Sequence, residues 1–498
     1  MTDVLSGPLA AYGLSETTKG YLTKGIFGHF IGGQADETGE GTIDVFDPSS
    51  GVKIGEVVNG GAAVVDRAVN LAQKSFDSGE WRFMHPMERE RRLHRLAQLV
   101  LEYTPILAEM DTLDAGIQKM FTDFYMPLAA ETIDYYAGWP SKLSGSIPSV
   151  DANCSVYLNR EPLGVCSVIV PWNAPAFAAL SAVPALAAGN SVIVKPAQQT
   201  PLSAAFIGHL YAEAGIPADA VHIVQGDGST GQALVEHPSV SKISFTGSVA
   251  TGRRIQAAAA PRLKQVTLEL GGKSPNIVFA DADLELAAGA CAAAVWNNSG
   301  QVCTAGTRVL VQRSVHDQLV AAMVEGSKNI HVGGAFDPAT QMGPIITAQQ
   351  LEQVAGYVES GISEGAQIAL GGKRIERDGY YFEPTIFTGV RNDMKIAQEE
   401  IFGPVMSVVP FDTEEEAFAI ANDVEFGLAA GVWTNDLGIA HRAVRALRTG
   451  TVWVNTYQEN SVNVPYGGYK QSGHGRNLGE ESILGYTQTK SVWMRHSR

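Results

Sequence analysis

Between residues 164 and 272, short apolar runs alternate with stretches in which apolar residues recur every three or four positions. The first pattern is typical of buried strands and the second of helices. Strands that alternate with helices predict β-α units and a parallel, doubly wound sheet. The predicted strands are Gly164–Val170, Ser191–Val194, Ala220–Val224, Lys242–Phe245 and Gln265–Leu270, and the predicted helices are Ser203–Ala214, Gln232–His237 and Gly252–Ala259.

The same alternation returns between residues 273 and 470 and predicts a second α/β domain. Its predicted helices are Val315–Ile330, Gln349–Gly361, Glu414–Ala421 and Ile439–Arg448, and its strands include Val405–Pro410 and Thr451–Asn455.

Two segments stand apart from both domains. Residues 141–160 begin with Ser, Gly and Pro and end in the alternating run Ser155–Arg160, which resembles an exposed strand. The tail Tyr486–His496 alternates in the same way. An unpaired edge strand invites pairing with another chain, so these segments are candidates for subunit contact.

Composition narrows the class of protein. A chain of 498 residues is too long for one core and predicts two or three domains. With 45% hydrophobic and 18% charged residues, the chain is globular rather than disordered. The 52 acidic and 36 basic residues give a net charge of −16, which argues against nucleic acid or an anionic membrane as the main partner.

The four cysteines, at positions 154, 166, 291 and 303, match neither a zinc pattern nor a dense disulfide framework, so no metal is expected. Met1–Val4 lacks the basic start of a secretory signal, and polar residues or Pro interrupt every apolar window before the roughly 18 residues that cross a bilayer. A cytoplasmic protein with reduced thiols is expected.

Candidate chemistry centres on Cys303, within the small and polar run Asn298–Gly306. Glycines there let the backbone approach a ligand, and a thiolate close to backbone N–H groups has a lowered pKa. A lone cysteine is more often inert packing, so this interpretation depends on the other motifs.

Two further side chains supply complementary chemistry. Glu269 ends a predicted buried strand, where a carboxylate is costly unless it is paired or works as a general base. Asn173 lies in the rigid loop Pro171–Pro175, from which its amide can donate to a developing oxyanion. Taken singly, Glu269 is also consistent with an ion pair and Asn173 with an ordinary turn.

Three segments bear on a nucleotide. Phe245–Ser248 closes a strand before a helix, whose free N–H groups suit a phosphate. Glu399 and Glu400 precede a Gly-Pro turn, where one acid could hold a sugar hydroxyl or both could be solvated. Gly226–Gly231 has the form G-x-G-x-x-G but lacks an acid about 20 residues further on, so it is a poor pyrophosphate site. Together, thiol, carboxylate, amide and fold predict thiol-mediated oxidation of a carbonyl.

Six short motifs follow one another along the chain: Pro171-Trp172-Asn173, Val194-Lys195-Pro196-Ala197, Phe245-Thr246-Gly247-Ser248, Leu268-Glu269-Leu270-Gly271-Gly272-Lys273, Gly300-Gln301-Val302-Cys303 and Glu400-Ile401-Phe402-Gly403-Pro404. Through these motifs and their order the chain, from about residue 25 to its end, resembles the NAD(P)-dependent aldehyde dehydrogenase superfamily. The spacings from Glu269 to Cys303 and from Cys303 to Glu400, 34 and 97 residues, also fit that family.

The resemblance implies oxidation of a small aldehyde to the carboxylic acid with NAD(P). The Cys303 thiolate would form a thiohemiacetal and then a thioacyl enzyme, Asn173 and the Cys303 N–H would hold the oxyanion, and Glu269 would activate water. Lys195 would bind the adenosine ribose, Ser248 the pyrophosphate and Glu400 the nicotinamide ribose. The full implied cofactor set is Trp172, Lys195, Gln198, Gly228, Phe245, Thr246, Gly247, Ser248, Glu400 and Phe402.

The resemblance also implies an α/β architecture in three parts: a Rossmann-like NAD(P)-binding domain over residues 1–140 and 161–271, a catalytic domain over 272–470, and a small β oligomerisation arm over 141–160 and 486–498. Homodimers or homotetramers are usual in the family, and the sequence does not choose between them.

Departures from the family pattern refine these expectations. Gln198 stands where NAD-preferring relatives often carry Glu, and a neutral amide would not repel the 2′-phosphate of NADP. Asn477 replaces a common Glu, so an accessory proton relay would differ. Ala174 replaces bulkier aromatics, and Asn460 and Tyr466 fall in the expected substrate tunnel, which indicates a roomier tunnel for an aromatic or branched aldehyde.

Two alternatives stay open. Coenzyme-A-acylating relatives generally lack the basic Glu, so Glu269 favours water as the acceptor. A catalytically inactive relative with a structural role is disfavoured because Cys303, Asn173 and Glu269 are present together. Aliphatic, aromatic, terpenoid and semialdehyde substrates all fit the sequence.

Overall fold

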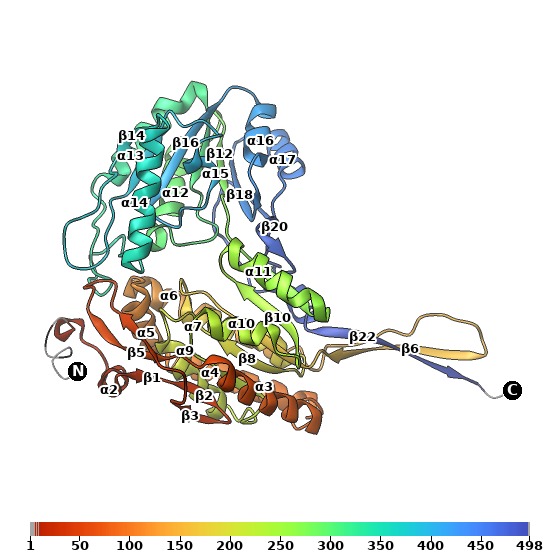
Figure 1. The fold of residues 1–498 in the computed structure, drawn as a ribbon. Helices are drawn as coiled ribbons and strands as arrows, with labels where there is room; N and C mark the ends of the chain where they lie inside the picture. Colours follow the sequence, from red (N-terminus) through yellow and green to blue (C-terminus); the bar gives the residue numbers. More distant parts are fainter. Residues whose placement is uncertain (1–4, 6, 8, 497–498) are drawn as a thin grey trace.

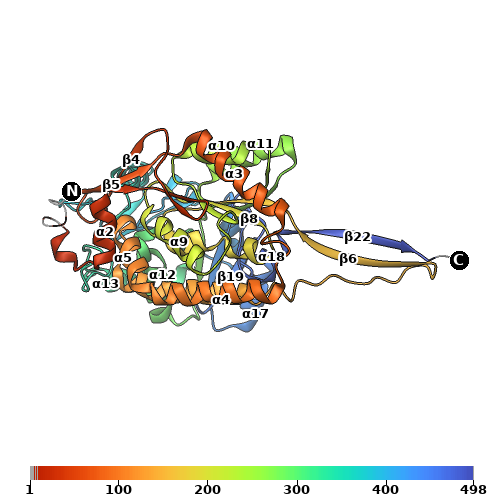
Figure 2. The same cartoon turned by 90° about the horizontal axis from the view of Figure 1, so that it is seen from below.

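The computed structural model describes Leu5, Gly7 and residues 9–496. Residues 1–4, 6, 8 and 497–498 lie outside this part, and with them the start Met1–Val4 and the outermost residues of the predicted domain and arm. Two α/β units lie next to each other, and a long two-stranded ribbon leaves one side of the molecule (Figure 1). Figure 2 shows the ribbon projecting well beyond the body.

An eight-stranded sheet organises the first unit, in the order β21-β11-β10-β7-β8-β9-β2-β3. The five strands from β11 to β9 are parallel, and counting from β7 they have the order 5-4-1-2-3 of a dinucleotide-binding sheet. The strands are β2 (His29–Ile31), β3 (Gln34–Asp36), β7 (Val165–Ile169), β8 (Ser191–Lys195), β9 (Val221–Ile223), β10 (Val240–Thr246), β11 (Gln265–Glu269) and β21 (Gly473–His474).

Alternate residues of these strands face two hydrophobic cores. On β7, Val165 and Ile169 belong to one core, whereas Cys166 and Val168 belong to the other. The first core is covered by α3 (Gly61–Ser78), α10 (Gly228–Glu236) and α11 (Val249–Ala259). The second is covered by α2 (Glu16–Lys24), α4 (Pro86–Glu102), α5 (Thr104–Ala115), α6 (Lys119–Ala137), α7 (Pro175–Leu180), α8 (Val183–Ala187), α9 (Leu202–Glu213) and α18 (Gly479–Leu484).

A seven-stranded sheet, in the order β14-β15-β16-β13-β12-β18-β19, organises the second unit. Its strand pairs are parallel except for β14 with β15. The strands are β12 (Pro275–Val278), β13 (Arg308–Gln312), β14 (Gln367–Leu370), β15 (Thr385–Thr388), β16 (Val405–Phe411), β18 (Ala429–Trp433) and β19 (Thr451–Val454). The helices are α12 (Leu284–Trp296), α13 (His316–Ser327), α14 (Ala348–Ser363), α15 (Lys395–Gln398), α16 (Glu414–Asn422) and α17 (Leu437–Ala446).

The ribbon consists of β6 (Cys154–Pro162) and β22 (Thr487–Arg495), paired antiparallel from Cys154–Arg495 to Pro162–Thr487. The strands predicted from residues 155–160 and from the tail are therefore confirmed, and they pair with each other. The remaining strands are β1 (Ile26–Phe27), β4 (Thr42–Phe46), β5 (Lys53–Val58), β17 (Phe426–Gly427) and β20 (Tyr469–Lys470). The short 3-10 turns are η1 (Ala10–Tyr12), η2 (Ala260–Arg262), η3 (Asn297–Gly300) and η4 (Arg313–Val315).

The predicted doubly wound fold is confirmed, and each strand and helix listed from the apolar pattern has a counterpart with ends within a few residues. Helices α5 and α6 did not emerge from that pattern. Helix α5 was not predicted because its C-terminal half is buried on all sides, including Asp111, Thr112 and Asp114, so that no exposed polar face distinguishes it. Within the described residues, no helix combines the length and apolar character needed to cross a bilayer.

Candidate active site

Strand order reverses between β7 and β10, and the loops that follow these strands open onto one cavity of about 290 Å³. Such a switch point, at the carboxyl ends of parallel strands, is where doubly wound sheets bind ligands. The cavity brings together predicted residues from segments far apart in the chain. Those that line it are Trp172, Asn173, Thr246, Gly247, Ser248, Glu269, Cys303, Glu400 and Phe402.

Cys303 reaches the cavity from a tightly turned loop. After α12, Asn298, Ser299 and Gly300 all have positive φ angles, of 46°, 55° and 73°. A Cβ atom at Gly300 would overlap the carbonyl oxygen of Gly403, so only glycine fits there. This turn ends the helical run and places the thiol against the cavity.

Gln301 fixes that loop, a role that sequence reasoning missed. Its buried side chain donates to the carbonyl oxygens of Asn298 and Pro344, at 3.1 and 3.3 Å, and accepts from the N–H of Ile346 at 2.9 Å. A fixed amide with three partners cannot adjust independently, so the loop is tied to residues 344–346.

Asn173 is oriented by the same loop. Its Nδ2 donates to the carbonyl oxygen of Gln301 at 2.9 Å, and its own carbonyl accepts from Asn298 Nδ2 at 3.3 Å. An amide nitrogen carries two hydrogens, so one N–H remains available to a ligand oxygen beside Cys303. The arrangement supplies the donor that an oxyanion requires.

Glu269 is the last residue of β11 and is only 3% exposed. Neither carboxylate oxygen has a hydrogen-bond partner among the described residues, so the structure does not support the structural ion pair considered as an alternative. Burial raises the pKa of Glu269 well above its usual value, and the charge of Arg476 only partly opposes this. A Cβ atom at Gly467 would lie 2.6 Å from Glu269 Oε1, so glycine there leaves room for the carboxylate.

The Cys303 thiol is in an environment that disfavours the thiolate. Burial raises its pKa to about 11, and the negative charges of Glu400 and Glu269 act in the same direction. The Tyr466 hydroxyl, 3.0 Å from Sγ, and the backbone N–H of Thr304 act in the opposite direction.

Two aromatic side chains close one side of the cavity. Trp172 and Phe402 meet edge to face, with ring centroids 5.3 Å apart and an angle of 88°. Phe402 has a φ of 55°, and Gln350 Nε2 holds that turn by donating to the carbonyl oxygens of Ile401 and Phe402, at 3.1 and 3.0 Å. Gln350 itself lines the cavity and was not predicted.

Glu400 faces the glycines that follow β11. The N–H of Gly272 donates to Glu400 Oε1 at 3.2 Å, and a Cβ atom at Gly271 would overlap the carboxylate. Burial raises the pKa of Glu400 to about 7, and the Gly272 N–H and the charge of Lys273 counteract this. A sugar hydroxyl could therefore donate to the Glu400 carboxylate in place of the Gly272 N–H.

The turn after β10 presents the start of α11. Ser248 is the N-cap, its Oγ accepting from the N–H of Thr251, and the first helical turn has no acidic residue. Gly247 and Ser248 line the cavity, whereas Phe245 does not: its buried ring packs beneath Gly247, 2.5 Å from where a Cβ atom would lie. Phe245 therefore shapes the turn.

Lys195, Gln198 and Gly228 lie outside the cavity lining: Lys195 ends β8, Gln198 follows it in the next loop, and Gly228 begins α10. Lys195 Nζ donates to the carbonyl oxygen of Pro196 at 2.9 Å, and burial lowers its pKa to about 8, partly offset by Asp227. Asp227 caps α10 with its side chain, so the G-x-G-x-x-G segment is accounted for as a helix start.

The residues expected to refine the substrate tunnel and the proton relay do not all lie at this cavity. Tyr466 and Asn477 line the cavity. Asn460 is exposed and donates to the carbonyl oxygen of Gln458, and Ala174 immediately precedes α7.

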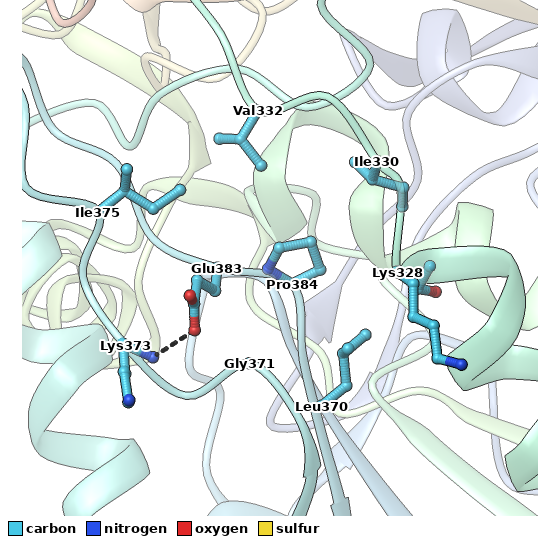
Figure 3. A pocket seen from close by; sticks show the side chains of 10 residues that line it. Lys328, Ile330, Val332, Leu370, Gly371, Lys373, Ile375, Glu383 and Pro384 are labelled. Carbon is cyan, nitrogen blue, oxygen red and sulfur yellow. Dashed lines mark hydrogen bonds between the residues drawn. The ribbon is translucent and has the colours of Figure 1, made fainter.

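A second, larger cavity of about 440 Å³ lies on the other unit, between the end of α13 and the β14–β15 hairpin (Figure 3). Apolar side chains such as Ile330, Val332 and Ile375 line it, and the N–H of Lys373 donates to Glu383 at 3.2 Å. It contains none of the predicted catalytic residues, so size alone does not mark the active site.

A thiol, an amide donor and an unpaired buried carboxylate around one cavity of a dinucleotide-type sheet define a dehydrogenase that acts through a cysteine. Comparison with protein families makes this specific: residues 35–492 match the model of the aldehyde dehydrogenase family. The chain belongs to the aldehyde dehydrogenase family, whose members oxidise aldehydes to carboxylic acids.

Solved structures agree over nearly the whole chain. An indole-3-acetaldehyde dehydrogenase of P. syringae, solved with NAD+ and IAA, is 40% identical, with a TM-score of 0.93 over 96% of this chain and 99% of that chain. An aldehyde dehydrogenase of Bacillus cereus, solved with NAD+, is 40% identical, with a TM-score of 0.95 over 97% and 99%. A betaine aldehyde dehydrogenase of Staphylococcus aureus is 37% identical, with a TM-score of 0.93 over 95% and 98%.

Proposed function

We propose that this enzyme is a hydrolytic, NAD-dependent aldehyde dehydrogenase in which Cys303 is the nucleophile, Asn173 the oxyanion donor and Glu269 the general base. The convergence of these three side chains on one cavity at the β7/β10 switch point carries the proposal. Each has the chemical form that its role needs: a thiol facing the cavity, an amide with an N–H left for a ligand, and a carboxylate that makes no hydrogen bond within the normal limits to the described residues.

In the first half-reaction, the Cys303 sulfur bonds to the aldehyde carbon, and the carbonyl electron pair moves to the oxygen. Asn173 Nδ2 and the Cys303 N–H stabilise that oxyanion as it forms. NAD, when bound, supplies the acceptor for the hydride that leaves the same carbon. The oxygen then re-forms its double bond, and Cys303 is left as a thioester.

In the second half-reaction, Glu269 takes a proton from water while the water oxygen bonds to the acyl carbon. The carbon–sulfur bond breaks, the acid leaves and the Cys303 thiolate is restored. An unpaired, buried carboxylate beside the sulfur favours water over coenzyme A as the acceptor.

The residues proposed for NAD fit its parts. The free N–H groups at the start of α11, with Gly247 and Ser248, suit the pyrophosphate, and Thr246 precedes them. Glu400 suits the nicotinamide ribose, and Lys195, with Gln198 and Gly228 beside it, suits the adenosine ribose. Trp172 and Phe402 would line one side of the cofactor site, and Phe245 would act through Gly247. The NAD+ bound to the related dehydrogenases supports this choice.

We further propose the three-part division given above, with the ribbon as the oligomerisation arm of a homodimer or homotetramer. Exposed Tyr157, Trp493 and Met494 on the projecting ribbon support an assembly role. A cytoplasmic location is supported by four unpaired cysteines, a state that reducing compartments maintain.

Formation of reduced cofactor across a panel of aldehydes, with NAD and NADP separately, tests the proposal. We expect turnover of an aromatic or branched aldehyde, in keeping with Ala174 and with the indole-3-acetaldehyde dehydrogenase among the relatives. Replacing Cys303 by Ala should abolish turnover. Full activity of Cys303→Ala would refute the mechanism.

A further inference from the structure

Tyr466 lies beside the sulfur of Cys303, a contact that no motif foretold. Its hydroxyl oxygen is 3.0 Å from Sγ, and both residues line the cavity. The Tyr466 backbone is held from both sides, because its N–H donates to the carbonyl oxygen of Asn477 at 2.6 Å and its carbonyl accepts from the Asn477 N–H at 2.8 Å. The phenol is therefore placed by a fixed backbone.

Charged groups near the Cys303 thiol act against its ionisation, whereas the Tyr466 hydroxyl acts in favour of it. Glu269 ends β11 and Glu400 precedes the β16 strand, and both carboxyl groups oppose a thiolate. Tyr457, also nearby, directs its hydroxyl to the carbonyl oxygen of Thr304 at 2.9 Å. The Tyr466 hydroxyl is thus placed where it can donate to the sulfur, alongside the Thr304 backbone N–H.

We propose that Tyr466 is a further catalytic residue, which donates its hydroxyl hydrogen to the Cys303 thiolate and so maintains the reactive form of the nucleophile. This proposal rests on the role proposed for Cys303. A hydrogen bond to the charged form of a group favours that form. The structural role that any buried tyrosine could have would not change the titration of a neighbouring thiol.

The phenol keeps its proton throughout. Burial, together with the nearby Cys303 and Glu269, raises the pKa of Tyr466 well above its usual value, so it is a donor at every working pH. The Cys303 proton is released to water when the thiolate forms. As the carbon–sulfur bond then forms, negative charge leaves the sulfur for the carbonyl oxygen and the hydrogen bond from Tyr466 weakens.

The test measures the thiol directly in cofactor-free enzyme. Wild type and Tyr466→Phe are alkylated with iodoacetamide across a pH series, and the rate at Cys303 is read from its peptide by mass spectrometry. Loss of the hydroxyl should move the midpoint of the pH profile upward by about one unit and slow alkylation near neutral pH about tenfold. The midpoint reports ionisation, whereas altered access would change only the plateau.

Tyr466→Leu, which also lacks the hydroxyl, should shift the midpoint in the same direction. Tyr381→Phe is the matched control, because it removes a buried phenol that donates to the carbonyl oxygen of Ser49 at 2.9 Å, away from the cavity. Superimposable profiles for wild type and Tyr466→Phe would overturn the proposal. Since alkylation needs neither aldehyde nor NAD, this result is independent of whether the proposed dehydrogenase reaction is found.

Discussion

At the scale of single residues, the site consists of polar groups that the fold buries without satisfying. Glu269 has two carboxylate oxygens without partners, and Asn173 keeps one N–H free. An unsatisfied buried carboxylate costs stability, so its retention in a cavity beside a thiol indicates that the cost is offset by chemistry.

Replacing Glu269 by Gln removes the proposed base and keeps the shape of the side chain. We expect the first turnover to persist as a burst of about one reduced cofactor per site, while steady-state kcat falls by about a hundredfold to ten-thousandfold. In the wild type, kcat should rise with pH through the raised pKa of Glu269, because only the ionised carboxylate accepts a proton. Stopped-flow absorbance follows both; unchanged steady-state turnover in the variant would contradict the assignment.

Gly271→Ala tests the position of Glu400. The added methyl group would overlap the Glu400 carboxylate and displace it, so KM for NAD should rise about tenfold with a smaller change in kcat. Gly289→Ala is the control, because a Cβ atom there meets nothing within 4 Å and an exposed helix gains stability from alanine. If the two variants had equal kinetics, the proposed place of Glu400 in the cofactor site would be contradicted.

Gln198→Glu tests cofactor choice. A carboxylate at this position would repel the 2′-phosphate of NADP, so kcat/KM for NADP should fall about tenfold to a hundredfold while that for NAD changes little. Initial rates with each cofactor give the ratio. The control Gln199→Glu adds the same charge at the neighbouring residue. An equal loss of kcat/KM for NADP in this control would show that position 198 does not determine cofactor choice.

Sequence reasoning reached Cys303, Glu269, Asn173 and Glu400 because each lies in a short motif at a strand end or in a loop, and because the motifs have the order and spacing of one family. It did not reach the Tyr466–Cys303 contact or the Gln301 anchor. Both depend on segments that lie far apart in the chain, 163 residues in the first case, and no local periodicity encodes such a meeting. Phe245 was assigned to the cofactor for its motif, but its side chain faces the core instead.

At the scale of elements, buried acids join helices that the apolar pattern did not reveal. Asp111 of α5 is fully buried; its Oδ2 accepts from the N–H of Ala176 at the start of α7, 3.0 Å away, and from the hydroxyl of Tyr125 on α6. Asp114 likewise accepts from the N–H of Leu202 at the start of α9. Helix α7 directly follows the Asn173 loop, so α5 supports the site from behind.

Asp111→Asn should alter the pH dependence of stability. Burial raises the folded-state pKa of Asp111 to about 6, above the unfolded value of about 3.9. The wild type therefore loses about 2–3 kcal/mol of stability as pH rises from about 4 to above 6, and the variant does not. Thermal unfolding across this range should show the Tm of the variant gaining on that of the wild type as pH rises. Glu131→Gln, at an exposed position on α6, is the control for the loss of one carboxyl group, and a Tm curve for Asp111→Asn that runs parallel to that of the wild type would contradict the prediction.

The sheet strands could be predicted because both of their faces are buried, which gives short apolar runs, and most helices because one buried side leaves a period of three to four residues. Where burial is complete, as at the end of α5, the period disappears even though the helix forms. Short α7 and α8 were also missed, since six and five residues are too few to show a repeat.

At the scale of the whole molecule, the ribbon of β6 and β22 exposes Trp493 at 65% and Tyr157 at 41% on a projection away from both cores. Trp493→Asp should weaken the proposed assembly and lower the mass measured by sedimentation velocity at low protein concentration. Ile362→Asp on α14, also at an exposed apolar position, should leave the mass unchanged. An unchanged mass for Trp493→Asp would argue against the ribbon as the assembly arm.

The ribbon also constrains the order of events during synthesis. Strand β6, at Cys154–Pro162, is synthesised before its partner β22, at Thr487–Arg495, and more than 300 residues separate the two strands. Strand β21, which completes one edge of the first sheet against β11, is likewise made late. A nascent chain therefore carries β6 without its partner, and an open sheet edge at β11, until the strands β21 and β22 have been synthesised. In the proposed assembly, the ribbon could make its contacts only after β22 has been synthesised, and products that stop before residue 487 would expose β6 to aggregation.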